Sequence, residues 1–370
     1  MNFDFSDDVI MMRDEVARVL RDRFPPGAVR QAVDSGGAHD RAFWRQLGEM
    51  GWLGVALPEA YGGAGLGYEA LCMIAEEMGG VLATVPFAST VYLAAEALLL
   101  AGSEEQKSVW LPRLASGDLI ATLAIAEGPG DPRPEAIQAR AGAGGLSGIK
   151  LPVIDGDVAD IAIVAARGER DEVGLWLVDL NGQGVTREPL KSLDAVRRSV
   201  RLSLSDATAD RLPGLSGWGA IEQLLDRAAI LFAFEQVGGA QAALDMAVEF
   251  AKDRFAFGRP IASFQAIKHK LADIYVATEL ARSNAYYGAW AIEHDAPELP
   301  VAAAAARVAA TDAFSLASRE NIQTHGGMGF TWESDCHLYY RRSRELALVV
   351  GSTRYWRGRL IDHLDRRNHG

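Results

Sequence analysis

The chain has 370 residues, of which 49% are hydrophobic and 23% are charged, ordinary values for a globular protein with two or three packed domains. Its net charge of −12 argues against nucleic acid as a general partner, because phosphate neutralisation needs a basic surface. The two cysteines, Cys72 and Cys336, have no metal-ligand spacing, so the sequence predicts neither a metal centre nor a disulfide framework.

The first third of the chain, residues 1–120, is predicted to be a helical domain. Apolar residues recur every three or four positions from Val9 to Leu20, which is typical of a helix with one buried face. The most apolar stretch, "VPFASTVYLAAEALLLAG", contains Glu96 and several small residues, so a buried helix is favoured over a membrane span. The N-terminus lacks the basic-then-apolar layout of a signal peptide, so we expect a cytoplasmic protein with no membrane partner.

Residues 121–213 are predicted to form a β domain. The segments "LIATLAIAE", "ADIAIVAA", "VGLWLVDL" and "SVRLSLSD" are short, rich in β-branched or alternating apolar residues, and bounded by Gly, Asp or Asn. In the last of them Val200, Leu202 and Leu204 alternate with polar residues, which is the period of a half-buried strand.

Residues 214–370 return to long helical runs, and we predict a four-helix bundle there. The alanine-rich "PVAAAAARVAATDAFSLASRENIQTH" is expected to pack closely against a neighbouring helix. The whole chain is therefore predicted to be α+β, with an N-terminal helical domain, a middle β-barrel or sandwich and a C-terminal four-helix bundle. In the helical run before the alanine-rich one, "FQAIKHKLADIYVATELARSNAYYGAWAI", one face consists of apolar or small residues, namely Ile267, Leu271, Ile274, Thr278, Ala281 and Ala285.

Two stretches could carry chemistry. In "RFAFGRPIASFQAIKHKLAD" the glycine and proline are ordinary helix punctuation, whereas Arg254 and Phe257 would offer a guanidinium and a ring to a phosphate-bearing aromatic ligand. In "NIQTHGGMGFTWESD" a helix ends in a turn where Gly326 and Gly327 would let main-chain amides approach a pyrophosphate. On residue chemistry alone, each stretch is either a turn or a binding site.

Taken in order with three others, these stretches resemble the acyl-CoA dehydrogenase family. The others are "GWLGVALPEAYGGAG", "EEMGG" and "GSEEQKSVWLPRLASGDLIATLAIAE", so the resemblance spans nearly the whole chain. It implies the fold described above, FAD bound between subunits of an oligomer, and α,β-dehydrogenation of an acyl-CoA thioester. It also implies that the ADP part of FAD is held across a subunit interface by Arg254, Phe257, Gln323, Gly326 and Gly327.

The family's catalytic base is missing from its usual positions. In this family a carboxylate removes the α-proton, which is only weakly acidic. Its usual source is a Tyr-Glu-Gly-Thr turn, and setting "VVGST" against that turn by its glycine puts Val350 in the place of Glu. In other members the Glu lies on the first long bundle helix, where this chain has Ala228 followed by Ala229. Of the nearby acids, Asp226 points about 200° around the helix from Ala228, and Glu345 is interpreted as a surface or ion-pair residue.

The middle domain departs from the family in the same direction. The family's "T-E-P" segment, whose Thr faces the flavin, reads "AEG" here, with Ala126 at the Thr position. Its "W-I-T-N" strand, which covers the flavin ring and bonds N5, reads "PVID", with Pro152 and Ile154 in place of Trp and Thr. The contacts to the flavin ring are thus lost, whereas those to the ADP part are retained.

Three hypotheses remain open on this basis. The chain is the non-catalytic subunit of a heteromeric acyl-CoA dehydrogenase, whose second subunit bears the Glu and whose substrate is bulky, such as a steroid side-chain thioester. Alternatively, it is a self-sufficient homo-oligomeric dehydrogenase with an unrecognised base. The third hypothesis is a binding or scaffold protein that keeps the fold without FAD. The selective loss of ring contacts favours the first, and the resemblance allows electron-transfer flavoprotein as a further partner.

Overall fold

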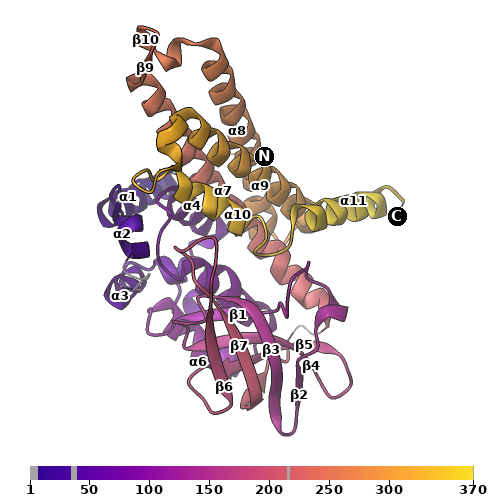
Figure 1. Ribbon diagram of the computed structural model, residues 1–370. Helices are drawn as coiled ribbons and strands as arrows, with labels where there is room; N and C mark the ends of the chain where they lie inside the picture. The colour runs from indigo at the N-terminus through magenta and orange to yellow at the C-terminus, as the bar shows by residue number, and fades with distance from the viewer. Residues whose placement is uncertain (1–6, 35–39, 215–216, 370) are drawn as a thin grey trace. The chain divides into compact units, whose positions relative to one another are not determined.

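The computed structural model describes residues 7–34, 40–214 and 217–369 (Figure 1). By its internal contacts the chain divides into two compact units. We call them the bundle unit, which comprises Met1–Gly36, Tyr68–Ala83 and Ala229–Gly370, and the sheet unit, which comprises Gly37–Gly67 and Thr84–Ala228.

The sheet unit contains an eight-stranded sheet in the order β6-β7-β3-β2-β4-β5-β8, with β1 pairing in parallel to β4 (Figure 1). The β4–β5 pair is antiparallel and runs from Ile161↔Asp179 to Arg167↔Val173. The strands are β1 (Ala121–Ala124), β2 (Arg140–Gly142), β3 (Gly145–Ile154), β4 (Ile161–Arg167), β5 (Val173–Asp179), β6 (Val185–Leu190), β7 (Ser199–Ala207) and β8 (Ala209–Arg211).

All four segments predicted as strands are confirmed, since they form β1, β4, β5 and β7. The four segments leave out β2, β3, β6 and β8. In β6, the sequence "VTREPL" has only two strongly apolar residues, at its ends, and one proline. It pairs only with β7 in the strand order, and an edge position of this kind tolerates Pro189 and polar side chains.

The predicted apolar helix of the sheet unit forms as a π-helix, η3 (Ala88–Ala95), continued by α5 (Glu96–Ala101). Two fully buried hydroxyls bind η3 to the sheet: Thr90 Oγ1 donates to the Ala121 carbonyl at 3.0 Å, and Ser89 Oγ donates to Asp155 Oδ2 at 2.7 Å. The other helical segments of this unit are α3 (Arg41–Glu49), η1 (Trp52–Gly54), η2 (Glu59–Tyr61), α6 (Glu104–Ala115) and η4 (Pro134–Ala136).

The bundle unit is formed mainly by long helices, as predicted for the C-terminal part of the chain (Figure 1). One of them, α7 (Trp218–Asp253), begins in the sheet unit and continues in the bundle unit. The other elements are α1 (Asp7–Arg23), α2 (Ala28–Asp34), α4 (Gly67–Gly80), β9 (Phe255–Ala256), β10 (Arg259–Pro260), η5 (Ile261–Ser263), α8 (Gln265–Glu293), α9 (Leu299–His325), η6 (Gly326–Phe330), α10 (Cys336–Leu346) and α11 (Thr353–His369).

Small residues set how closely the bundle helices approach. A Cβ atom built on Gly79 of α4 would lie 1.9 Å from the Glu235 carbonyl oxygen, and one built on Gly238 of α7 would lie 1.8 Å from that of Glu76. Because such contacts are impossible, both helices need glycine where they cross. The predicted buried face of α8 is confirmed from Ile274 onward.

Close packing also explains the apolar character of α9. By length and composition alone, this helix with the turn after it could cross a membrane, and half of its most apolar window is buried inside the structure. Alanines at 302, 303, 304, 306, 310, 313 and 317 are at most 1% exposed. Such a composition is weak support for a membrane span, because core helices of helical bundles share it.

Candidate functional site

The first candidate stretch forms a tight β-hairpin that displays an aromatic ring. β9 and β10 pair in the register Ala256↔Arg259, so Phe257 and Gly258 are the two turn residues. Their φ angles are +53° and +78°, which identifies a type I′ turn. A phenylalanine rarely adopts a positive φ, and this one leaves its side chain 96% exposed. The strained backbone and the exposed ring of Phe257 together favour a binding role over that of a simple turn between two helices.

Arg254 lies at the base of the same hairpin. Its amide donates to the Phe250 carbonyl at 2.9 Å and its carbonyl accepts the Ile261 amide at 2.7 Å, so the backbone is fixed while the residue is exposed. The second hairpin arginine, Arg259, instead stacks its guanidinium 4.0 Å above the centre of the Phe264 ring. The two arginines therefore have different surroundings, although both are exposed.

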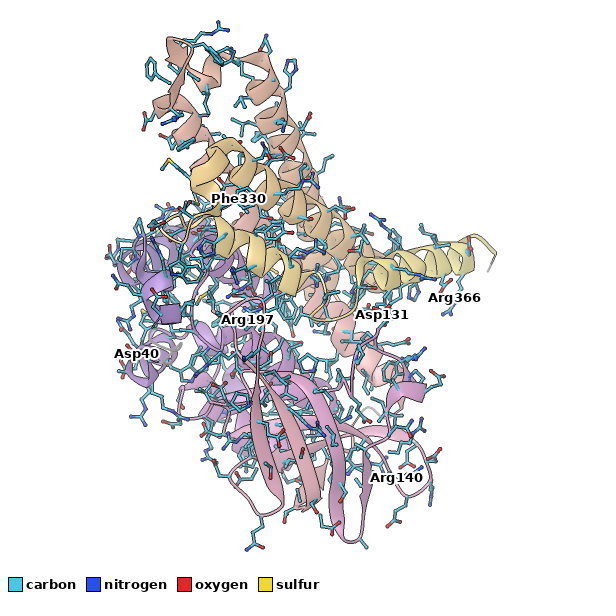
Figure 2. The ribbon with its side chains drawn as sticks, viewed as in Figure 1. Asp40, Asp131, Arg140, Arg197, Phe330 and Arg366 are labelled. Atoms are coloured by element: carbon cyan, nitrogen blue, oxygen red, sulfur yellow. The ribbon has the colours of Figure 1, made fainter. Side chains whose placement is uncertain are left out.

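The second candidate stretch ends α9 in a glycine turn. Gly326 has φ 60° and ψ −135°, a combination that favours glycine, and a Cβ on Gly326 or Gly327 would meet no atom within 4 Å. Open space at both glycines leaves their main chain accessible to a ligand. Gln323 is exposed one turn earlier on α9. Phe330 at the end of η6 is also 77% exposed (Figure 2).

An aromatic contact brings the two stretches together. The ring of His325, at the end of α9, stacks on that of Phe250, one turn before Arg254 on α7, with centroids 4.1 Å apart. A ring nitrogen of His325, Nδ1, lies 2.9 Å from the Asn321 carbonyl. Burial lowers the pKa of His325, so the neutral ring is favoured.

The turn aligned with the family's base is well ordered but carries no acid. Val350, only 3% exposed, accepts a hydrogen bond at its carbonyl from Trp356 Nε1 at 3.2 Å. The preceding helix end is held by the buried Arg307, whose guanidinium donates to the Leu346 carbonyl. Hydrogen bonds thus hold the main chain of this turn in place, while the Val350 side chain cannot accept a proton.

The other positions considered for the base are on α7 and α10. Ala228 and Ala229, at the family's second position for the Glu, are fully buried on α7 and carry no carboxylate. Asp226, on the same helix, is 2% exposed. Glu345 lies 3.6 Å from the Arg342 guanidinium, so its interpretation as an ion-pair residue is confirmed.

The middle-domain positions lie in the sheet unit and present no polar side chain. Pro152 is exposed on β3, and the peptide bond before it is cis. Ile154 is half-buried, and its carbonyl accepts the Thr122 hydroxyl at 2.6 Å. Ala126 is half-buried and its carbonyl accepts the Leu151 amide at 2.8 Å. These side chains can pack against a ligand but cannot hydrogen-bond it.

Sequence reasoning missed a buried ion pair directly beside these positions. The Nζ atom of Lys150, whose side chain is fully buried, lies 2.6 Å from Oε1 of Glu127. Burial lowers the pKa of Lys150 to about 8, although the hydrogen bond that Lys150 donates to Glu127 opposes this effect. A lysine between apolar residues in "GIKLPVID" was the available signal, because buried lysines need a partner.

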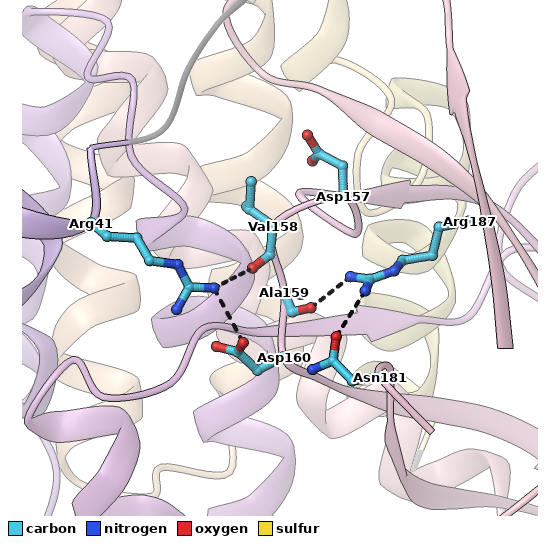
Figure 3. Close-up of a pocket in the computed structure, with 7 residues that line it drawn as sticks. All are labelled: Arg41, Asp157, Val158, Ala159, Asp160, Asn181 and Arg187. Atoms are coloured by element: carbon cyan, nitrogen blue, oxygen red, sulfur yellow. Dashed lines mark hydrogen bonds and ion pairs between the residues drawn. The ribbon is translucent and has the colours of Figure 1, made fainter. Parts of the chain in front are cut away.

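A separate polar pocket of about 270 Å³ lies in the sheet unit around the turn 157–160 (Figure 3). Arg41 donates to the Val158 carbonyl at 3.3 Å and to Asp160 at 3.1 Å. Arg187 donates to the Ala159 carbonyl at 2.9 Å and to the Asn181 side chain. Both guanidinium groups thus bind the protein itself, which favours a structural role in closing the turn.

Comparisons with known proteins agree with the motifs. Models of the acyl-CoA dehydrogenase N-terminal and C-terminal domains match residues 6–118 and 216–364. Acyl-CoA dehydrogenase IpdE2 of Mycobacterium tuberculosis is 35% identical, over 93% of this chain and 93% of its own length.

Solved structures share the whole fold. The Tcur3481-Tcur3483 steroid acyl-CoA dehydrogenase has 30% identity and a TM-score of 0.88, covering 98% of this chain and 99% of its own. The ChsE4-ChsE5 complex of Mycobacterium tuberculosis has 27% identity and a TM-score of 0.89, covering 99% of each chain. With its α+β architecture, its hairpin and its glycine turn, the chain belongs to the acyl-CoA dehydrogenase family.

Proposed function

We propose that this chain is the base-lacking subunit of a heteromeric acyl-CoA dehydrogenase and that it lends contacts to an FAD whose ring lies in a base-bearing partner. Enzymes of this family oxidise a CH–CH bond of an acyl-CoA, and bound FAD supplies the hydride acceptor. The observation that carries the proposal is Val350, a buried valine at the position that aligns with the family's base.

The residues expected at the ADP part of FAD fit that group. We call Arg254, Phe257, Gln323, Gly326 and Gly327 the adenine-side residues. A guanidinium suits a pyrophosphate, an exposed ring suits a nucleotide base, and glycines with open space allow close approach of main-chain amides. They lie in the two stretches that follow Phe250 on α7 and surround His325 at the end of α9, where the two rings stack.

The positions expected at the flavin ring do not fit a catalytic role. We call Ala126, Pro152, Ile154 and Val350 the ring-side positions. None of them can donate a hydrogen bond from its side chain, and none can take up the α-proton. Loss at four positions with retention at five others supports a division of labour between two subunits.

Similar proteins support the same proposal. The ChsE4-ChsE5 complex and the Tcur3481-Tcur3483 dehydrogenase each carry two component names, and the second is described as a steroid enzyme. By analogy, we propose a bulky, steroid-like acyl-CoA as the substrate class of the assembly.

The test is to replace Arg254 in this subunit only. A charge-assisted contact to phosphate contributes on the order of 2 kcal/mol, or roughly thirtyfold in affinity. In the complex co-expressed with its Glu-bearing subunit, Arg254→Ala should therefore strip FAD and abolish activity. Arg259→Ala is the matched control, because it removes the same charge from the same hairpin and should leave flavin bound.

The flavin count of the unmutated assembly is the second measurement. One FAD for every two chains, lost on Arg254→Ala, is the expected result. One FAD per chain, or flavin retained in the Arg254 variant, would overturn the proposal. A full count together with acyl-CoA oxidation by this chain alone would favour a self-sufficient enzyme.

A further inference from the structure

We propose that Lys150 and Glu127 are positioning residues that fix the main chain of the ring-side wall in the sheet unit. This wall is the segment 125–127 together with β3 from Lys150 to Ile154. The inference concerns the chain's own fold, so it stands or falls separately from the shared-FAD proposal.

The lysine ties the two parts of the wall together. From its place on β3, Lys150 Nζ donates to Glu127 Oε1 at 2.6 Å and to the Ile125 carbonyl at 3.1 Å. One residue further along, the Leu151 amide donates to the Ala126 carbonyl at 2.8 Å. Three successive residues of the segment 125–127 are therefore bound to two successive residues of β3.

The glutamate extends the contact to a third segment. Its Oε2 accepts the Gln138 amide at 2.8 Å, and its Oε1 accepts the Ala139 amide at 3.0 Å. The carboxylate thus receives two main-chain donors in addition to the ammonium group. The Lys150 side chain is fully buried and that of Glu127 is 12% exposed, so water competes little for these bonds.

In this wall, the residues that hold the main chain differ from those whose side chains would face a ligand. Ala126 and Pro152 stand where the family has its flavin-facing Thr and Trp, and neither can bond a flavin. The charged groups that hold the main chain around them nevertheless remain, buried and mutually bonded. A wall held in this way can still present a fixed apolar surface.

Amide hydrogen exchange of the chain itself tests the proposal. Lys150→Met should speed exchange at the Gln138, Ala139 and Leu151 amides by about tenfold or more, because the hydrogen bonds that Nζ donates to Glu127 and Ile125 are lost. Lys150→Arg, which keeps a hydrogen-bond donor there, should restore most of the protection.

The pH dependence of amide exchange gives a second readout. Opening of the wall exposes Lys150 to water, where its pKa returns towards 10.5, so opening takes up a proton above pH 8. Corrected for intrinsic exchange, protection of the three amides should rise with pH, by at most about tenfold per unit. Lys150→Arg should remove this dependence. A flat profile in the unmutated chain, or unchanged exchange in a folded Lys150→Met variant, would overturn the proposal.

Discussion

The adenine-side residues of this chain match the family's motifs, whereas the ring-side positions depart from them. On the adenine side, the hairpin holds Phe257 in a rare backbone conformation with its ring almost fully exposed. At the ring-side positions, hydrogen bonds hold the main chain, from Trp356 to the Val350 carbonyl and from Leu151 to the Ala126 carbonyl. The side chains there can neither take up a proton nor donate a hydrogen bond. The difference teaches that hydrogen bonds can hold the main chain of this turn without a carboxylate at the position aligned with the family's base.

The largest expected effect concerns restoration of the base. The chain alone should not dehydrogenate acyl-CoA, and Val350→Glu should leave activity at least about a hundredfold below that of a full restoration, because the hydrogen-bond donors to the ring are still missing. The full restoration adds Ala126→Thr, Pro152→Trp and Ile154→Thr. Anaerobic bleaching of flavin by a saturated acyl-CoA measures both. Equal rates for the single and the quadruple variant would show that the other ring-side positions have little influence.

A smaller effect is expected on the affinity for FAD, which should depend on the adenine-side residues and not on the ring-side positions of this chain. Phe257→Ala should weaken FAD binding by the assembly roughly tenfold, since stacking of a base on an aromatic ring contributes about 1–3 kcal/mol. Ala126→Thr in this chain should leave affinity unchanged if the ring lies in the partner subunit. Flavin fluorescence during dilution of the complex measures both variants. A stronger effect from Ala126→Thr than from Phe257→Ala would reverse the comparison.

The smallest expected effect is on the pH dependence of stability, and it tests whether Lys150 is buried beside the ring-side positions. Burial lowers the pKa of Lys150 from 10.5 to about 8, so between these values the unfolded chain holds a proton that the folded chain has released. Stability should therefore rise with pH in this window, by about 1 kcal/mol from pH 8 to pH 9. Urea unfolding at both pH values measures it, relative to Lys150→Met, in which this contribution disappears. Identical pH dependence in both chains would mean that Lys150 is not buried in solution.

Much of the fold could be predicted from local patterns. The alternation in β7 and the apolar face of α8 are repeated signals, so both elements were predicted correctly. β6 was missed because an edge strand needs few apolar residues. The need for glycine at positions 79 and 238 also could not be predicted, because it arises where two helices cross.

Residue chemistry alone left the stretches around Arg254 and Gly326 as either turns or binding sites. The resemblance to the family implied their roles at the ADP part of FAD and the missing base, and these roles stay predictions. The contact between Phe250 and His325 was not predictable, because these residues are 75 positions apart and only the packing of α7 on α9 joins them. Lys150 was overlooked because its partner, Glu127, lies on a different segment.

The Phe257 conformation has a consequence for engineering. Asparagine and glycine adopt a left-handed backbone far more readily than phenylalanine, so an Asn-Gly turn would relieve strain on the order of 1 kcal/mol. Selection for heat resistance of the isolated chain would therefore favour Phe257→Asn. Such a variant would melt later and purify well, yet lose the ring that we assign to the cofactor. Thermal screening of the isolated chain would thus discard the aromatic ring that we propose it lends to a partner's cofactor.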